Sequence, residues 1–239
     1  MAGVGSRRKN DALILSGEVT VNGHVVQELG LRVRPGKDRI SVGGKMIGIA
    51  EKPVYILFNK PKDTITTTSD EKGRTTVMNY VRLKQRVFPV GRLDRNTTGV
   101  LFFTNDGDLA NALIHPAREI EKIYRATLDR QVSHEDLGKL RKGVQLSDGY
   151  AKPRSVEIVD GSRRKKILLS IHEGRNHEIR RIFEALGYDV KQLERVSFAG
   201  LTTLGLSRGG WRFLTRAEID FLKETAGVES RRDDDEIFS

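Results

Sequence analysis

A single carboxylate stands between two arginines in residues 89–107, which read PVGRLDRNTTGVLFFTNDG. The carboxylate is Asp94, and Arg92 and Arg95 flank it in a polar turn. An apolar run follows, Val100 to Phe103, with the length and composition of a buried strand. A buried strand directly after the turn would hold the carboxylate rigidly in place, which favours a functional role for Asp94. The alternative is an Asx turn or a surface salt bridge, and spacing alone leaves both interpretations open.

The balance of charge indicates an anionic partner. The 239-residue chain carries 42 Lys and Arg against 32 Asp and Glu, a formal charge of +10. Such an excess favours a polyanion through counterion release, with nucleic acid the first candidate and an anionic membrane surface the second. The hydrophobic content of 37% suits a globular protein with a substantial core.

Scarce residue types restrict the chemistry. The chain has no Cys, which excludes disulfides, thiol nucleophiles and thiolate metal sites. Its five His lack the spacing of a zinc site, so we expect no metal. No stretch approaches the roughly 18 apolar residues of a membrane-spanning helix, and no signal-peptide pattern opens the chain. We therefore expect a cytoplasmic protein that makes no use of a membrane.

The first 45 residues predict a small αβ domain. Ser6 is a suitable N-cap for a helix over 6–16, and its first residues are Arg7, Arg8 and Lys9. Asn22-Gly23 lies between two short apolar runs, which is typical of a type I′ hairpin.

The wording of this region resembles the S4 RNA-binding module in two segments, GVGSRRK at 3–9 and GEVTVNG at 17–23. The resemblance implies that the basic residues at the helix start contact RNA. S4 modules usually begin with a helix before this turn, so we expect a module over 1–45 whose first helix is missing or whose true start lies upstream. The alternative is a small basic domain with a solvated charged face.

The rest of the chain predicts a linker, a large domain and a tail. Adjacent glycines and a proline without clear periodicity mark 43–53 as linker-like, and we take 46–53 as the linker itself. Residues 54–228 form the large domain, and the acidic tail 229–239 is expected to be disordered. Strands are predicted at 54–58, 64–68, 87–90, 100–103, 121–128, 155–159, 167–171, 196–198 and 201–206, and helices at 77–83, 107–114, 134–142, 176–186 and 216–224.

The helix over 176–186 has the clearest pattern. Its apolar residues recur at i, i+3, i+4 and i+7 and predict a core-facing stripe. Its other faces carry His177, Arg180 and Arg181, which are either solvated or face phosphates or an acid. On the strand over 121–128, Tyr124 shares one face with Ala126 and Leu128.

The segment GRLD at 91–94, followed by TTG at 97–99, resembles the signature of RNA pseudouridine synthases, specifically the RsuA/RluB type that acts on ribosomal RNA. Four further matches occur in the expected order: KP at 60–61, EKIY at 121–124, EGRNHEIRR at 173–181 and GWRFLT at 210–215. The resemblance implies an α+β fold, with helices packed on a mostly antiparallel or mixed sheet. It implies no cofactor, because the reaction detaches, turns and rejoins the uracil base without a redox step.

The resemblance also implies roles for particular residues. Asp94 takes the place of the catalytic aspartate, which either adds to the sugar or removes its 2′ proton. Arg180 takes the place of the basic residue that pairs with this aspartate and favours its charged form. Tyr124 stacks on the target base and assists proton removal from its ring carbon. Arg92 fills the gap that the flipped nucleotide leaves, and Arg175, His177 and Arg181 are further RNA-binding candidates.

The expected partner is ribosomal RNA or a pre-ribosomal particle, bound by a monomeric enzyme. The wording RNTT at 95–98 and ANALIHP at 110–116 leans towards the RluB side, hence the large subunit, and leaves the small subunit open. The alternative from another class is a ribosome-assembly factor that binds rRNA through its basic surface without modifying it.

Overall fold

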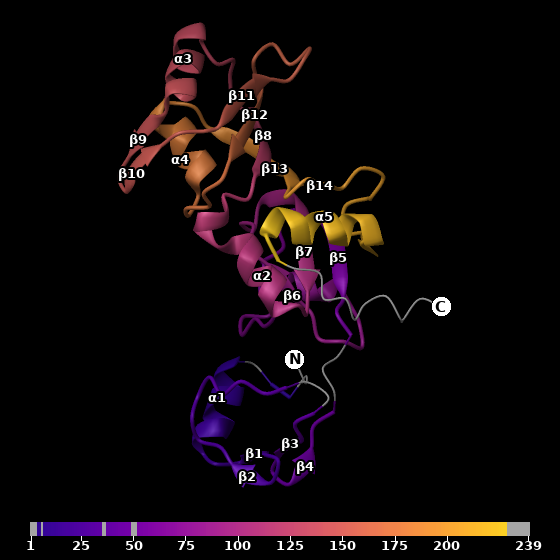
Figure 1. Ribbon diagram of the computed structural model, residues 1–239. Coiled ribbons are helices and arrows are strands. Elements are labelled where there is room, and N and C mark those ends of the chain that lie inside the picture. The colour runs from indigo at the N-terminus through magenta and orange to yellow at the C-terminus, as the bar shows by residue number, and fades with distance from the viewer. Residues whose placement is uncertain (1–3, 6, 35–36, 49–51, 229–239) are drawn as a thin grey trace. The chain divides into compact units, whose positions relative to one another are not determined.

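The computed structural model describes residues 4–5, 7–34, 37–48 and 52–228, and the predicted disordered tail lies outside these ranges (Figure 1). The chain divides into two compact units. Unit 1 comprises Met1–Pro53 with Lys84–Arg86, and unit 2 comprises Val54–Leu83 with Val87–Ser239.

Unit 1 is one helix and a small antiparallel sheet. The helix is α1 (Arg7–Leu15), as predicted, and the strand order is β2-β1-β3-β4. The strands are β1 (Val19–Val21), β2 (His24–Val25), β3 (Ile40–Val42) and β4 (Lys45–Met46). Asn22 and Gly23 have φ of 53° and 87°, so the predicted type I′ hairpin is confirmed.

A second tight turn replaces the start of the expected linker. Gly43 and Gly44 have φ of 55° and 76° and join β3 to β4. The interpretation of these two glycines as linker is therefore wrong. Paired glycines serve a hairpin turn as well as a linker, and the strand that follows has only two residues, too few to show a pattern.

Unit 1 encloses little apolar surface. None of the side chains described between residues 4 and 48 is fully buried. Instead, α1 and the sheet line an open apolar groove that includes Leu13, Ile14, Val21 and Ile40. A unit of this size gains little free energy from burial.

Unit 2 is built on a nine-stranded mixed sheet. Its strand order is β11-β12-β8-β13-β7-β5-β15, with β14 beside β13 and β6 beside β7. All neighbours are antiparallel except β7 and β13, which are parallel. The strands are β5 (Tyr55–Lys60), β6 (Phe88–Val90), β7 (Thr97–Thr104), β8 (Lys122–Leu128), β11 (Ser155–Ile158), β12 (Lys166–Ile171), β13 (Val190–Phe198), β14 (Leu201–Thr202) and β15 (Trp211–Phe213). The expected α+β fold with a mixed sheet is confirmed.

The helices of unit 2 are α2 (Gly107–Ile114), α3 (His134–Lys142), α4 (Glu178–Ala185) and α5 (Arg216–Ala226), with short 3-10 turns at Val77–Asn79 and Pro116–Arg118. Helices α2, α3 and α5 begin where the sequence indicates, and α4 begins two residues after its predicted start. The Asp106 side chain caps α2 by accepting from the Leu109 N–H, and Thr215 with Glu218 forms a capping box on α5. None of the helices in the described ranges is long and apolar enough to cross a membrane.

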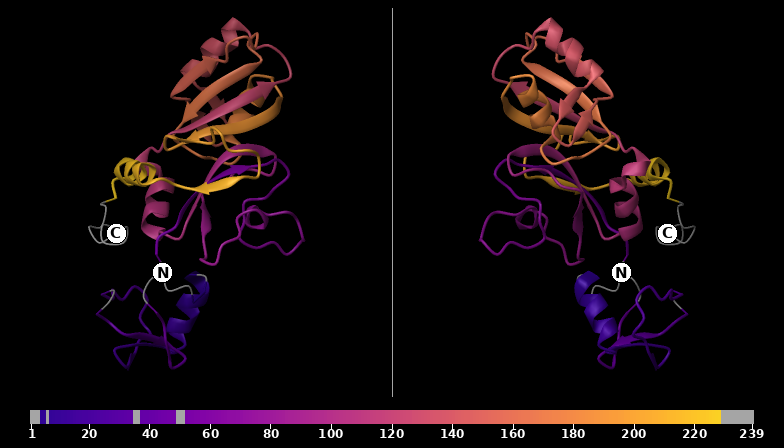
Figure 2. Two further views of the ribbon diagram at one scale, coloured as in Figure 1. Left: turned by 90° about the vertical axis from the view of Figure 1, so that its right-hand side faces the viewer. Right: turned by 90° about the vertical axis from the view of Figure 1, so that its left-hand side faces the viewer.

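The helices cover opposite faces of the sheet at different places. α3 and α4 contribute to one core with Tyr124, Ala126 and Leu193, and α2 and α5 contribute to a second core with Leu57 and Phe102. Figures 1 and 2 show α2 and α5 side by side, away from α3 and α4. Each half of the sheet therefore has its helices on a different face.

Several strand predictions differ from the structure. Residues 64–68 form only an isolated bridge, Ile65 to Thr76, because the Thr66 and Thr67 hydroxyls bond to nearby carbonyls instead of leaving an open strand edge. The predicted strand at 196–198 is the end of β13, whose earlier polar residues hide its period. The predicted strand at 201–206 ends at Thr202, and 77–83 is helical only over Val77–Asn79.

Besides β4, three short strands, all in unit 2, were not predicted. These are β15 and the separate hairpin of β9 (Val144–Leu146) with β10 (Gly149–Ala151). Each has three residues, which is too short for alternation to be recognised in the sequence.

The parallel contact between β7 and β13 requires Gly99. A Cβ on Gly99 would lie 2.1 Å from the Arg195 carbonyl oxygen, and the residue has φ of 103°. We expect Gly99→Ala to lower the free energy of unfolding by at least about 3 kcal/mol. Gly73→Ala is the matched control, since its φ is 66° and no atom lies within 4 Å of the added Cβ. It should cost about 1 kcal/mol. Urea denaturation measures both, and equal losses would contradict the role of close packing.

Candidate active site

The turn that carries Asp94 is anchored by the residue before it. Leu93 is only 6% exposed and belongs to the core that contains Tyr124. Asp94 reaches the surface, with 40% of its side chain exposed, and Arg92 is also exposed. The Thr97 N–H donates to the Asp94 carbonyl at 3.0 Å and closes the turn. The core therefore fixes the backbone, and the turn presents a carboxylate to solvent.

Lys60 lies beneath this turn. It is the last residue of β5 and is fully buried. Its Nζ donates to the carbonyl oxygens of Asp94, Arg95 and Thr97 at 3.0, 3.2 and 2.8 Å, and to that of Pro61 at 3.2 Å. One ammonium thus directs three carbonyls of the turn inwards, which leaves the Asp94 side chain facing outwards.

Burial controls the charge of Lys60. Desolvation lowers the pKa of its ammonium from 10.5 to about 8, although the carboxylates of Asp94 and Asp63 act in the opposite direction. A buried cation this close to Asp94 also favours negative charge on the turn. The sequence alone indicates no role for Lys60, which belongs only to the KP match at 60–61. A lysine directly after an apolar strand is the signal that could have identified it.

A second segment supports the turn from the other side. The Thr66 Oγ1 donates to the Leu93 carbonyl at 2.8 Å and accepts from the Leu93 N–H at 3.3 Å. The Thr64 N–H donates to the Arg95 carbonyl at 3.3 Å. Arg95 itself pairs with Asp63 at 2.6 Å, but both side chains are more than half exposed, so this ion pair contributes little.

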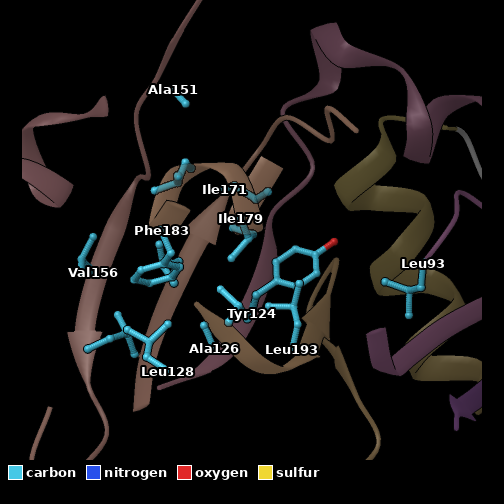
Figure 3. Packing of buried hydrophobic residues seen from close by; sticks show 14 of the residues in the cluster. Leu93, Tyr124, Ala126, Leu128, Ala151, Val156, Ile171, Ile179, Phe183 and Leu193 are labelled. Atoms are coloured by element: carbon cyan, nitrogen blue, oxygen red, sulfur yellow. The ribbon is translucent and has the colours of Figure 1, made fainter. Parts of the chain in front are cut away.

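Tyr124 lies in the same core as Leu93. It is 9% exposed on β8 and shares a face with Ala126 and Leu128, as predicted. Figure 3 shows its ring at the end of the cluster, with the hydroxyl oxygen directed towards Leu93 and away from Phe183. That hydroxyl makes no hydrogen bond to the residues the structure describes. A phenol in this position can contact a nucleobase that is bound beside Asp94.

His177, rather than Arg180, is the described ion-pair partner of Asp94. The His177 Nε2 lies 3.5 Å from the Asp94 Oδ1, a contact that is ionic only when the imidazole is protonated. His177 precedes α4 in a left-handed backbone conformation with φ of 50°, and its side chain does not cap the helix. Arg180 instead donates from Nη1 to the Val190 carbonyl at 2.9 Å. The structure brings Asp94 and His177 together, and the pairing with Arg180 stays a prediction.

The other two arginines of this segment bind a carboxylate of the protein. Arg181 contacts Asp148 at 2.8 and 2.9 Å, and the Arg175 Nη1 lies 3.7 Å from it. The Arg181 hydrogen bond is the main reason that the pKa of Asp148 lies below its usual value. Asp148 lies in the turn of the β9–β10 hairpin, so these contacts attach the hairpin to the start of α4. Their assignment to RNA binding stays a prediction.

Two further ionisable groups, the half-buried Lys122 and the buried Glu178, hold the loop before α4. The Lys122 Nζ donates to the carbonyls of His172 and Glu173 at 2.6 and 3.3 Å, and burial lowers its pKa. Glu178 is 5% exposed and accepts from the Arg175 N–H at 3.1 Å, and burial raises its pKa. Sequence reasoning gave neither residue this role, because their tertiary partners have no local signature.

The remaining predicted RNA-binding residues are exposed. Arg92 makes no hydrogen bond or ion pair within the described ranges, so its guanidinium is available to a ligand. Arg8 and Lys9 are exposed on α1 of unit 1, and the side chain of Arg7 lies outside the described atoms. Within the residues described, no group of three or more His, Cys, Asp or Glu could hold a metal ion.

The turn presents the Asp94 carboxylate, Arg92 lies exposed two residues before it, and Tyr124 lies in the core that holds Leu93. These groups can attack or deprotonate a sugar and hold a nucleobase. The profile of the RNA pseudouridylate synthase family matches residues 54–185, and that of the S4 domain matches residues 1–40. The chain belongs to the RNA pseudouridine synthase family and is an isomerase with an N-terminal S4 domain.

Individual relatives agree with this class. The chain is 43% identical to the Bacillus subtilis "Ribosomal large subunit pseudouridine synthase B", over 94% of this chain and 93% of that protein. It is 40% identical to an "Uncharacterized RNA pseudouridine synthase" of Aquifex aeolicus, over 95% of this chain and 92% of that protein. A solved structure titled "Crystal structure of pseudouridylate synthase" superposes with a TM-score of 0.68 at 27% identity, covering 91% of this chain and 94% of that one.

The position of Lys60 predicts an effect on turnover. Lys60→Met keeps the length of the side chain but leaves the turn carbonyls without their donor, so Asp94 should lose its fixed position. We expect kcat to fall about 10- to 100-fold with little change in KM. Steady-state assays of pseudouridine formation measure both. Lys72→Met, at an exposed position, should be silent, and an unchanged kcat for Lys60→Met would contradict the positioning role.

The pKa of Lys60 predicts a pH dependence of stability. Between about pH 8 and 10.5 the unfolded chain binds the Lys60 proton and the folded chain has released it. The free energy of unfolding of the unsubstituted protein, relative to Lys60→Met, should therefore rise across this interval, by roughly 1 to 3 kcal/mol. Urea denaturation of both proteins at pH 7.5 and 10 tests the sign. A constant difference would show that Lys60 keeps an ordinary pKa.

Proposed function

We propose that this protein converts a uridine of large-subunit ribosomal RNA to pseudouridine, with Asp94 as the catalytic carboxylate. The observation that carries the proposal is the turn itself: an exposed carboxylate whose backbone is held by a fully buried ammonium. The substrate is inferred from the printed name of the Bacillus subtilis relative, which aligns over nearly the whole chain. The basic charge of +10 agrees with an RNA substrate.

The reaction is an isomerisation in which the bond from N1 of uracil to C1′ breaks and a bond from C5 to C1′ forms. The proton on C5 leaves, and N1 gains one, so atoms and electrons balance without a cofactor. In one route Asp94 adds to C1′ as the base departs, and in the other it removes the 2′ proton. Both routes start from the carboxylate anion and end with the free carboxylate restored, and both remain open for this protein.

Tyr124 and Arg180 are proposed as the other catalytic residues. The phenol of Tyr124 stacks on the detached base and helps to remove the proton from C5. When RNA binds, the Arg180 guanidinium leaves the Val190 carbonyl and approaches Asp94, where it favours the carboxylate anion. The contact of His177 with Asp94 supports a related role, since an imidazole at 3.5 Å can stabilise the same anion.

The remaining proposed roles concern the RNA. Arg92 replaces the flipped nucleotide in the stack, which agrees with its exposure and its lack of a partner within the described ranges. Arg175, His177 and Arg181 contact RNA near the site. Arg7, Arg8 and Lys9 contact RNA from the S4 domain. We extend this domain from the expected 1–45 to Met46, so that it includes β4, and separate it by a linker at 47–53 from the catalytic domain at 54–228. The enzyme acts in the cytoplasm as a monomer on rRNA or a pre-ribosomal particle.

The proposal predicts that Asp94→Asn abolishes pseudouridine formation. The amide can neither add to the sugar nor remove its proton, while its size preserves the turn, so turnover should fall by at least about 10³-fold. The measurement is chemical mapping of pseudouridine in both rRNAs of a deletion strain. The strain expresses either the unsubstituted protein or Asp94→Asn, at equal levels. Mapping both subunits also identifies the target.

The matched control is Asp160→Asn, an exposed aspartate in the turn after β11, which should restore the modification fully. If Asp94→Asn also restored it, Asp94 would have no part in the chemistry. If the unsubstituted protein formed no pseudouridine but its deletion impaired ribosome assembly, the protein would be a binding factor instead of an enzyme.

A further inference from the structure

A polar groove of about 420 Å³ lies on the sheet of unit 2. Strands β8, β12 and β13 provide most of its lining, and the segments after β5 and before β7 close one end. Its lining residues are Lys62, Asn96, Thr98, Arg125, Thr127, Lys166, Lys191, Gln192, Leu193, Glu194 and Arg208. We call it the β8–β13 groove.

The groove opens on the face of the sheet opposite Tyr124. Side chains alternate along β8, and Tyr124 with Ala126 points into the core beneath α4. Arg125 and Thr127 therefore point to the other face. The helices on that face, α2 and α5, pack over β5, β7 and the end of β13. On this face, the surface formed by β8 and the first half of β13 is therefore not covered by α2 or α5.

The groove is strongly basic. Its cations are Lys62, Arg125, Lys166, Lys191 and Arg208, and its one acid is Glu194. Lys62 and Lys166 form no ion pair within the described ranges, and Lys191 pairs only with Asp189, where both side chains are more than half exposed. Most of this charge is therefore available to a ligand.

Glu194 arranges two of the cations. It pairs with both Arg125 and Arg208, and Arg208 also donates to the Asn59 side chain. Burial opposes ionisation of Glu194, but these two guanidinium groups lower its pKa overall. The arginines are thus held in place before a ligand arrives, which reduces the entropic cost of binding an anion.

The lining chemistry identifies the ligand as a phosphodiester backbone. Lysines, guanidinium groups, hydroxyls and amides are the groups that bind phosphate oxygens. The lining contains no aromatic side chain on which a base could stack. A chain of phosphates matches a basic surface of this kind, and contacts of this type carry affinity without reading sequence.

We propose that the β8–β13 groove binds the phosphate backbone of the rRNA substrate outside the segment that enters the active site. The inference rests on the proposed function for the identity of the RNA. Asn96 and Thr98 link the two places, because they follow Asp94 within the same turn and strand while lining the groove. RNA that flanks the target uridine can therefore pass around the turn and engage the back of the sheet.

The test is the double substitution Lys166→Glu with Lys191→Glu. Its matched control is Arg141→Glu with Lys142→Glu, which makes the same change in charge at exposed positions at the end of α3. Binding to an rRNA fragment that extends well beyond the target uridine is measured at several salt concentrations. The groove variant should bind about tenfold more weakly at 0.1 M salt, and the slope of log affinity against log salt should decrease by about 2.

Turnover separates this inference from the proposed function. The groove variant should raise KM on the long fragment without changing kcat, and its thermal unfolding should match that of the control. If both variants bind with equal affinity while pseudouridine forms normally, the groove inference is overturned and the enzyme remains. If no pseudouridine forms but the groove variant alone loses affinity, the groove stands and the catalytic proposal fails. An unsubstituted protein that binds no rRNA would overturn the groove inference as well.

Discussion

The contact on which the site depends is the buried ammonium of Lys60 beneath three carbonyl oxygens of the Asp94 turn. A charged group in the interior is costly unless its donors are satisfied, and here the backbone of the turn satisfies them. The same contact determines where the turn lies and which way Asp94 points. Thr66 and Leu93 then fix the turn from the side and from below. Lys60, Thr66 and Leu93 hold the backbone of the turn, which leaves the Asp94 side chain at the surface.

The sheet also holds in place the site residues that are distant from Asp94 in the sequence, Tyr124 and His177. β7 begins at the turn and runs parallel to β13, which lies between β7 and the strand that carries Tyr124. Gly99 permits that close approach, and Lys122 fastens the loop before α4 to the start of β8. His177 reaches Asp94 from this loop. Because α4 and α2 cover opposite faces, one half of the sheet keeps an open surface behind the site, and that surface is basic.

Local signals predicted many of the elements and missed those without a local cause. The starts of α2 and α5 and the Asn22-Gly23 hairpin were predicted because a cap or a tight turn forms within a few residues. The period of α4 and the face of β8 followed from burial on one side. By contrast, β13 carries Lys191, Gln192 and Glu194 on its open side, so its first half lacked an apolar pattern. The strands of the β9–β10 hairpin were too short to have any pattern.

By itself the sequence determined the basic charge, the absence of thiol chemistry, the resemblance to pseudouridine synthases and the position of Asp94 in a turn beside a buried strand. Each of these depends on residue type or on neighbours within one turn of chain. Only the tertiary structure decided that Lys60 supports that turn, that His177 contacts Asp94, and that Arg175 and Arg181 are engaged with Asp148. These contacts join residues 27 to 83 positions apart, or hold a charge whose cost depends on burial. Neither the distant contacts nor the burial of a side chain can be read from the residues next to it in the sequence.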